Sequence, residues 1–216
     1  YSDMARGLAR VLGFDLRVNF AEPYSACSLR EFWQRWHISL SEWLRDRVYL
    51  PLGGNRRGLP RTLCHLIVTM LAGGLWHGAA WHFVAWGGWH GIGLAGRVLW
   101  NRAGIPLPRI AGWMLTLAFV GASWLLFRAP DLETAGAMTR ALGDLSAPVW
   151  LGSAGIQLAW FGLPAGFLDW TARRHGFAKW GAALPATPKL LLQGALLFAS
   201  LRYWRTDGAA FLYFQF

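Results

Sequence analysis

Three histidines in the middle of the chain are the residues best suited to chemistry. His77, His82 and His90 fall inside a run of 35 residues, between Arg61 and Arg97, that contains no Asp, Glu, Lys or Arg. Burial among apolar side chains lowers the pKa of an imidazole, so a histidine there stays neutral near pH 7 and can accept a proton from a hydroxyl. Ionisable residues at membrane depth are costly, and their presence indicates a function.

His77 has the best position of the three for general base catalysis. It lies in a stretch that contains Gly73, Gly74 and Gly78. This density of glycine predicts a break in the helix, where a substrate could approach the backbone closely. Hydrogen bonding between helices is the other role open to His77 and His90.

A metal site is not expected in this region. His77 and His82 are five residues apart, about 140° around a helix, and one helical face cannot present both. No Asp or Glu occurs between residues 62 and 96 to complete a set of ligands.

A helix is predicted over residues 29–47, immediately before this region. Ser28 and Glu31 form a capping box, in which a Ser at the helix N-cap is followed three residues later by Glu. One face of the helix is apolar and consists of Phe32, Trp36, Leu40 and Trp43. A helix of this kind is typical of the membrane interface. His37 lies beside the apolar face, and its position alone favours an interfacial histidine bonded to backbone or water.

Apolar segments of membrane-spanning length dominate the chain. Hydrophobic residues make up 55% and charged residues 15%, which excludes a disordered chain and a typical soluble enzyme. A spanning helix needs about 20 mostly apolar residues. Single spans are predicted over 110–127, 145–168 and 190–201. The longer charge-free region, 62–96, is predicted to form a hairpin or re-entrant pair that enters and leaves the membrane on the same side.

The basic residues decide between a membrane and a nucleic acid as the partner. The net charge is +10, but Lys and Arg occur in short clusters that flank the predicted spans. They form no single exposed stripe, so nucleic-acid binding is not expected. By the positive-inside rule, the basic segments expected on the cytoplasmic side are 40–61, 97–109 and 169–189.

Two blocks of residues carry a family resemblance. The first, from Glu31 to Asp46, reads EFWQRWHISLSEWLRD, and the second, from Gly74 to Trp81, reads GLWHGAAW. Supporting blocks are Tyr49–Arg56, His90-Gly91, Leu126–Ala129 and Tyr213–Phe216. Together they resemble the membrane-bound O-acyltransferase (MBOAT) superfamily, in the branch of the alginate O-acetyltransferase membrane subunit.

The resemblance implies an all-α, polytopic membrane protein whose helices surround a tunnel. Residues 1–216 would form a single MBOAT-like domain, the C-terminal portion of the family without its N-terminal half. His77 matches the family's catalytic histidine and His37 its second site residue, which reverses the interpretation of His37 from helix position alone. The residues expected to line the tunnel are Trp36, Ser39, Trp76, Gly78, Trp81 and His90.

The implied activity is that of an O-acetyltransferase of the bacterial inner membrane, with His77 as general base. An acetyl group would pass from a cytoplasmic donor, acetyl-CoA or another acyl thioester, toward an extracytoplasmic, alginate-like exopolysaccharide or a partner protein. The expected partners are the lipid bilayer, periplasmic acetyltransferases and the polysaccharide, and no permanently bound cofactor is expected. Arg56 and Arg57 could attract an anionic donor, although the positive-inside rule also accounts for them.

A transporter or channel is the alternative function. It would use the same histidines as a proton relay and the broken hairpin as a gate. Formation of an acetylated product distinguishes the enzyme from the transporter.

Overall fold

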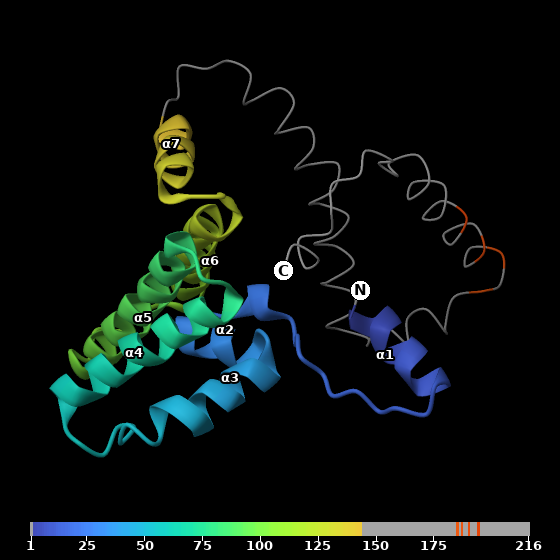
Figure 1. Cartoon of the computed structure of the whole chain (residues 1–216), viewed down its shortest axis with the longest axis horizontal. Helices are drawn as coiled ribbons and strands as arrows, with labels where there is room; N and C mark the ends of the chain where they lie inside the picture. The colour runs from blue at the N-terminus through green and yellow to red at the C-terminus, as the bar shows by residue number, and fades with distance from the viewer. Residues whose placement is uncertain (1, 144–184, 186, 188–189, 191–193, 195–216) are drawn as a thin grey trace. The chain divides into compact units, whose positions relative to one another are not determined.

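The computed structural model describes residues 2–143 and the isolated positions 185, 187, 190 and 194. The chain divides into two units, residues 1–144 and 145–216, and the first unit is described below. In the described part every regular element is helical (Figure 1). The elements are α1 (Ser2–Val11), η1 (Pro23–Ser25), α2 (Leu29–Arg35), α3 (Ile38–Leu44), η2 (Arg45–Tyr49), α4 (Leu59–His77), α5 (Trp81–Arg102), α6 (Arg109–Arg128) and α7 (Leu132–Gly143).

A helical hairpin of α4 and α5 forms the centre of the described unit (Figure 1). Gly74 of α4 faces Phe83 of α5, and Gly91 of α5 faces Ile67 of α4, so the two helices run antiparallel. The first residue of α4 and the last residue of α5 therefore lie at the same end of the pair. This is the hairpin predicted over residues 62–96.

The glycines of the hairpin have two structural roles, close helix packing and the bend between the helices. A Cβ on Gly74 would collide with the carbonyl oxygen of Phe83, and one on Gly87 would collide with that of Met70. These glycines lie inside continuous helices and allow backbone to touch backbone. The chain bends only after His77, at Gly78. The prediction of a break was therefore correct for Gly78 and wrong for Gly73 and Gly74, because a missing Cβ serves close helix packing as well as it serves a bend.

Helix α6 packs against α5 and contains the predicted span 110–127. Among the described helices, α6 alone has the length and the apolar composition to cross a membrane. The predicted spans 145–168 and 190–201 lie outside the described residues. The buried core lies where α2, α4, α5 and α6 meet, and it includes Phe32, Trp33, Met70, Trp86 and Val120.

The single helix predicted over 29–47 is wrong in one respect: it is broken in the middle. Its start is as predicted, because the Ser28 hydroxyl accepts a hydrogen bond from the Glu31 N–H at 3.2 Å. The chain leaves helical geometry at Trp36 and His37, restarts as α3 and ends in one π-helical turn, η2. The apolar period of the sequence continues through the break, so the pattern alone does not reveal it.

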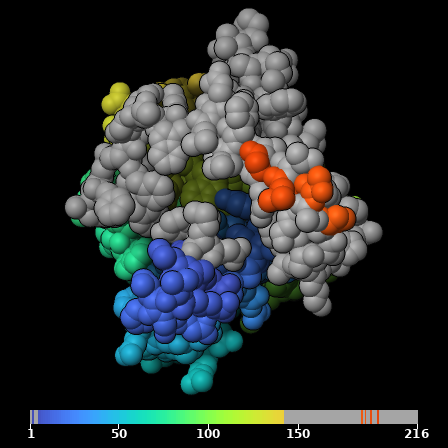
Figure 2. Space-filling model, turned by 90° about the vertical axis from the view of Figure 1, so that its right-hand side faces the viewer, coloured from blue at the N-terminus to red at the C-terminus, as the bar shows by residue number. Residues whose placement is uncertain are grey.

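Helix α1 is amphipathic. Leu8, Val11 and Leu12 are exposed on the surface of the molecule. In Figure 2 the blue atoms of α1 lie on the face turned toward the viewer.

The glycine contacts between α4 and α5 can be tested with two substitutions in α5. We expect Gly87→Ala to lower the free energy of unfolding by about 1–3 kcal/mol, because the added methyl meets the backbone of α4. Gly96→Ala is the matched control, since nothing lies within 4 Å of the added methyl. Thermal unfolding of the two variants in detergent measures the difference, and equal melting temperatures would contradict the close packing.

Candidate functional site

His37 occupies the break between α2 and α3 in a left-handed backbone conformation, with φ 43° and ψ 56°. For a residue other than glycine this conformation costs about 1–2 kcal/mol, and such residues gather at functional sites. Asn19 stabilises it from outside the helix. Its backbone carbonyl accepts from the Ile38 N–H at 3.0 Å, and its side-chain oxygen accepts from the Ser39 N–H at 2.9 Å. Asn19 thus caps α3 and fixes the position of His37.

The indole of Trp76 brings the two predicted catalytic histidines together. Its ring centroid lies 5.7 Å from that of His37 and 5.0 Å from that of His77. Trp76 and His77 are the last two residues of α4, so the end of that helix delivers both rings to the α2–α3 break. Half of the Trp76 side chain remains exposed.

Aromatic rings hold His77 on several sides. Trp86 of α5 and Phe127 of α6 lie with their ring centroids 5.1 Å and 5.0 Å from that of His77, at interplanar angles of 90° and 87°. Such edge-to-face arrangements are the preferred geometry for neighbouring rings. The imidazole of His77 is therefore fixed by contacts from three helices, α4, α5 and α6.

Hydrogen bonds to other described residues do not occupy the ring nitrogens of His37 and His77. Among the described residues His77 has no side-chain hydrogen bond, and the Nδ1 atom of His37 is buried without a partner. Burial also lowers the pKa of His37, which keeps its ring neutral. A buried imidazole nitrogen without a partner is uncommon and indicates a place where a ligand atom completes the hydrogen bonding.

His90 and His82 use their rings to join helices. His90 is buried and bonds to Trp33 and Ser123, with distances of 3.3 Å from Nδ1 and 3.0 Å from Nε2. The Nδ1 atom of His82 lies 2.8 Å from the carbonyl oxygen of Ala129, which ties the start of α5 to the end of α6. The hydrogen-bonding role that the sequence left open for His90 therefore describes its contacts in the structure.

The other residues predicted to line a tunnel fall at different depths. Trp36 packs among Phe20, Phe32 and Trp124, with ring centroids 4.9–5.6 Å away. Ser39 is partly buried in the first turn of α3. Gly78 is the C-cap of α4, directly after His77. Trp81 begins α5 and is 76% exposed.

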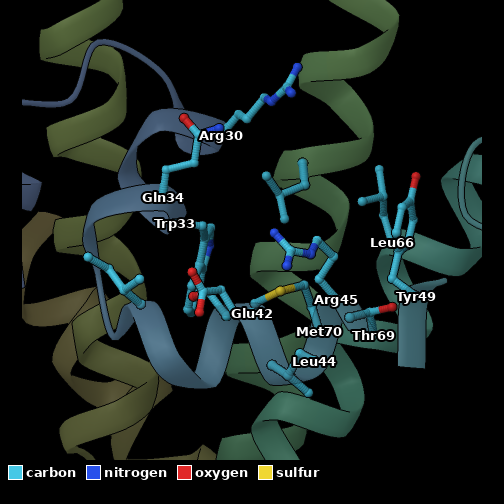
Figure 3. A pocket seen from close by; sticks show the side chains of 13 residues that line it. Arg30, Trp33, Gln34, Glu42, Leu44, Arg45, Tyr49, Leu66, Thr69 and Met70 are labelled. Atoms are coloured by element: carbon cyan, nitrogen blue, oxygen red, sulfur yellow. The ribbon is translucent and has the colours of Figure 1, made fainter. Parts of the chain in front are cut away.

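A cavity of about 390 Å³ lies beside the site, between α2, α3 and η2 on one side and α4 and α5 on the other. Figure 3 shows the side chains that line it, among them Trp33 of α2, Glu42 of α3, Arg45 of η2 and Met70 of α4. His37 and His77 do not line it. The cavity and the histidine pair are nevertheless linked, because Trp33 lines the cavity and packs on Trp86, with ring centroids 5.8 Å apart.

Arg56 and Arg57 lie in the exposed turn that joins η2 to α4. The side chain of Arg57 folds back over Gly53. Both arginines belong to the basic segment 40–61 that is predicted to be cytoplasmic, and neither lines the cavity. In the described part of the chain no three His, Cys, Asp or Glu residues are grouped closely enough to hold a metal ion.

Asn19 and Phe127 are the site residues that sequence reasoning assigned no role. The signal for Phe127 was the block Leu126–Ala129, which is weak by itself but supplies both the ring against His77 and the carbonyl that binds His82. Asn19 also lies in a pair that resembles the family, Asn19-Phe20, but no local pattern shows its capping role, which depends on a contact with Ser39, twenty positions away.

Comparison with known protein families identifies the family of this chain. The model of the family described as "MBOAT, membrane-bound O-acyltransferase family" matches residues 1–127, which include both histidines and the whole hairpin. The chain belongs to the membrane-bound O-acyltransferase family. The family resemblance found in the sequence is thereby confirmed.

Individual MBOAT relatives share the same region. The chain is 49% identical over 143 residues to the "Probable alginate O-acetylase AlgI" of Azotobacter vinelandii, which is 66% of this chain and 29% of that protein. It is 41% identical over 139 residues to the "Peptidoglycan O-acetyltransferase" of Helicobacter pylori, covering 62% of the chain and 26% of the relative. The chain thus matches less than a third of the length of these MBOAT proteins.

A more distant MBOAT relative transfers a different acyl group. The "Teichoic acid D-alanyltransferase" of Streptococcus thermophilus is 32% identical over 152 residues, covering 59% of this chain and 36% of that protein. The names of the three relatives have acyl transfer in common, while the acyl group and the polymer differ.

The cap on α3 can be tested through the stability of this MBOAT chain. We expect Asn19→Ala to cost about 1 kcal/mol of unfolding free energy, because the Ser39 N–H loses its acceptor. Asn19→Asp keeps an oxygen in that position and should retain most of the stability. Asn101→Ala, at an exposed asparagine near the end of α5, is the control. Thermal unfolding measures all three, and a loss no larger for Asn19→Ala than for Asn101→Ala would contradict the capping role.

Proposed function

We propose that this chain carries the catalytic histidines of a membrane O-acyltransferase that transfers acetyl from a thioester donor to a polysaccharide hydroxyl. One observation carries the proposal: His37 and His77, far apart in sequence, lie against the same indole within the region that matches the MBOAT family. Names of relatives that specify acetyl transfer to alginate or peptidoglycan support acetyl as the transferred group.

In the proposed reaction His77 is the general base. A neutral nitrogen of its ring takes the proton from the acceptor hydroxyl while the hydroxyl oxygen attacks the carbonyl carbon of the thioester. The C–S bond then breaks, and the thiolate leaves with the proton that the imidazole returns. A C–O ester bond replaces the thioester, and no oxidant or metal takes part in the step.

His37 has the role of orienting the reacting groups. Its left-handed backbone fixes the ring beside Trp76, and its partnerless Nδ1 atom is available to a hydroxyl or a carbonyl. Holding a reactant in the correct geometry lowers the activation barrier by converting a bimolecular step into a local one. Trp76, which contacts both rings and is half exposed, marks the position we assign to the reacting groups.

The proposal extends to the surroundings of the site. The donor is acetyl-CoA or another acyl thioester, supplied from the cytoplasmic side where Arg56 and Arg57 lie. The acceptor is an alginate-like exopolysaccharide outside the cytoplasmic membrane, reached through a tunnel between the helices and served by periplasmic acetyltransferases. Multi-pass insertion in the bacterial inner membrane follows from the predicted spans.

The test is acetylation of exopolysaccharide in cells that carry single substitutions in the intact protein. We expect His77→Ala to abolish acetylation, because the attacking hydroxyl loses its base, and His37→Ala to reduce it by at least about tenfold. The measurement is ester-linked acetate released from purified polymer by mild alkali, normalised to the amount of protein in the membrane fraction.

Leu75→Ala is the matched control, since this side chain lies two residues before His77 on α4 and is 56% exposed. It should retain acetylation. Acetylation that persists in His77→Ala would overturn the assignment of the base. Movement of a solute or of protons across the membrane with no acetylated product would instead support a transporter.

A further inference from the structure

His90 is more completely enclosed than the two proposed catalytic histidines. It lies in the middle of α5 and is 1% exposed. Its two ring nitrogens reach two other helices, because Trp33 belongs to α2 and Ser123 to α6. No other histidine in the described residues has hydrogen bonds on both nitrogens.

The hydrogen bonds of His90 have one consistent direction. An indole nitrogen only donates, so Trp33 Nε1–H donates to His90 Nδ1, which must be unprotonated. The proton of the neutral ring is therefore on Nε2, which donates to the Ser123 hydroxyl oxygen at 3.0 Å. That hydroxyl donates in turn to the Val120 carbonyl oxygen at 2.7 Å. Every polar atom of this chain of bonds has a partner, and the other tautomer, with its proton on Nδ1, would leave the Trp33 N–H facing an N–H.

Trp86 connects this chain of hydrogen bonds to the ring of His77. The rings of Trp33 and His90 both pack on Trp86, with centroids 5.8 Å and 4.8 Å from that of Trp86. Trp86 also contacts His77, at 5.1 Å and 90°, and Phe127, at 5.4 Å. Trp86 is 3% exposed, and its own Nε1 atom has no hydrogen bond, so packing alone holds it in place. Its orientation therefore depends on the rings around it, and Trp33 and His90 are the two of these that are themselves held by hydrogen bonds.

We propose that His90 is a positioning residue: the directed hydrogen bonds from Trp33 through His90 and Ser123 to Val120 hold Trp86 against His77 and so fix the orientation of the His77 ring. The inference rests on the proposed role of His77 as general base. His90 acts through Trp86 and does not contact the substrate. A misplacement of reacting groups by about 1 Å can cost on the order of a hundredfold in rate, so the support behind His77 matters for turnover.

The experiment compares His90→Leu with His90→Gln in the intact protein, purified in detergent and assayed with a thioester donor and an oligosaccharide acceptor. Leucine keeps the volume but removes both hydrogen bonds. The amide of glutamine has one acceptor and one donor, so it can satisfy both Trp33 and Ser123. We expect His90→Leu to lower kcat at least about tenfold with little change in the KM of the acceptor, and His90→Gln to recover most of that loss.

Ser123→Ala keeps His90 but removes the acceptor of its Nε2–H, and it should lower kcat in the same direction by a smaller factor. If His90→Leu does not accumulate in the membrane, Ser123→Ala tests the positioning role in its place, because this substitution removes only a single hydroxyl. Unchanged kcat in His90→Leu, or in Ser123→Ala when His90→Leu is absent, would overturn the proposal. An equal loss in the Leu and Gln variants, or a rise in KM without a fall in kcat, would show that His90 meets the substrate itself. The proposed function fails separately, if His77→Ala retains activity.

Discussion

The contact of backbone with backbone between α4 and α5 is the constraint on which the site depends. Gly74 and Gly87 each occupy a place where a side chain would collide with a carbonyl oxygen of the other helix. With the two helices this close, the end of α4 lies against the start of α5, and His77 meets Trp86 across the bend. Small residues at a helix contact allow this close approach, because no side chain separates the two backbones.

The hairpin supplies only part of the site, because other side chains of the site come from elements outside the hairpin. Phe127 approaches from the end of α6, and His37 from the break between α2 and α3. Hydrogen bonds position both: Ala129 accepts from His82 and Ser123 accepts from His90 at α6, and Asn19 accepts from Ser39 beside His37. Among the described histidines, His82 and His90 therefore join helices, whereas His37 and His77 both pack against Trp76.

The sequence predicted the hairpin, the capped start of α2 and the position of His77 at the bend from apolar length, capping chemistry and glycine density. It did not predict the break at His37, because a left-handed histidine has no compositional signal and the apolar period continues across it. The pairing of His37 with His77 came from the family resemblance alone. The role of His90 stayed open at that stage, since it depends on Trp33 and Ser123, which no local pattern relates to it.

The hydrogen bonds of Asn19 have a consequence for how this stretch of chain can vary. Asn19 reaches α3 at Ile38 and Ser39, while the nearby Ala21 N–H donates to the Arg35 carbonyl at 2.9 Å. The segment before α2 therefore runs along the break and is hydrogen-bonded to the residues on both sides of it. Its residue identities can change wherever these bonds are kept, but an inserted or deleted residue between Asn19 and Ala21, or between Arg35 and Ile38, would shift one attachment point relative to the other. The length of this segment is therefore more strictly constrained than its amino-acid composition.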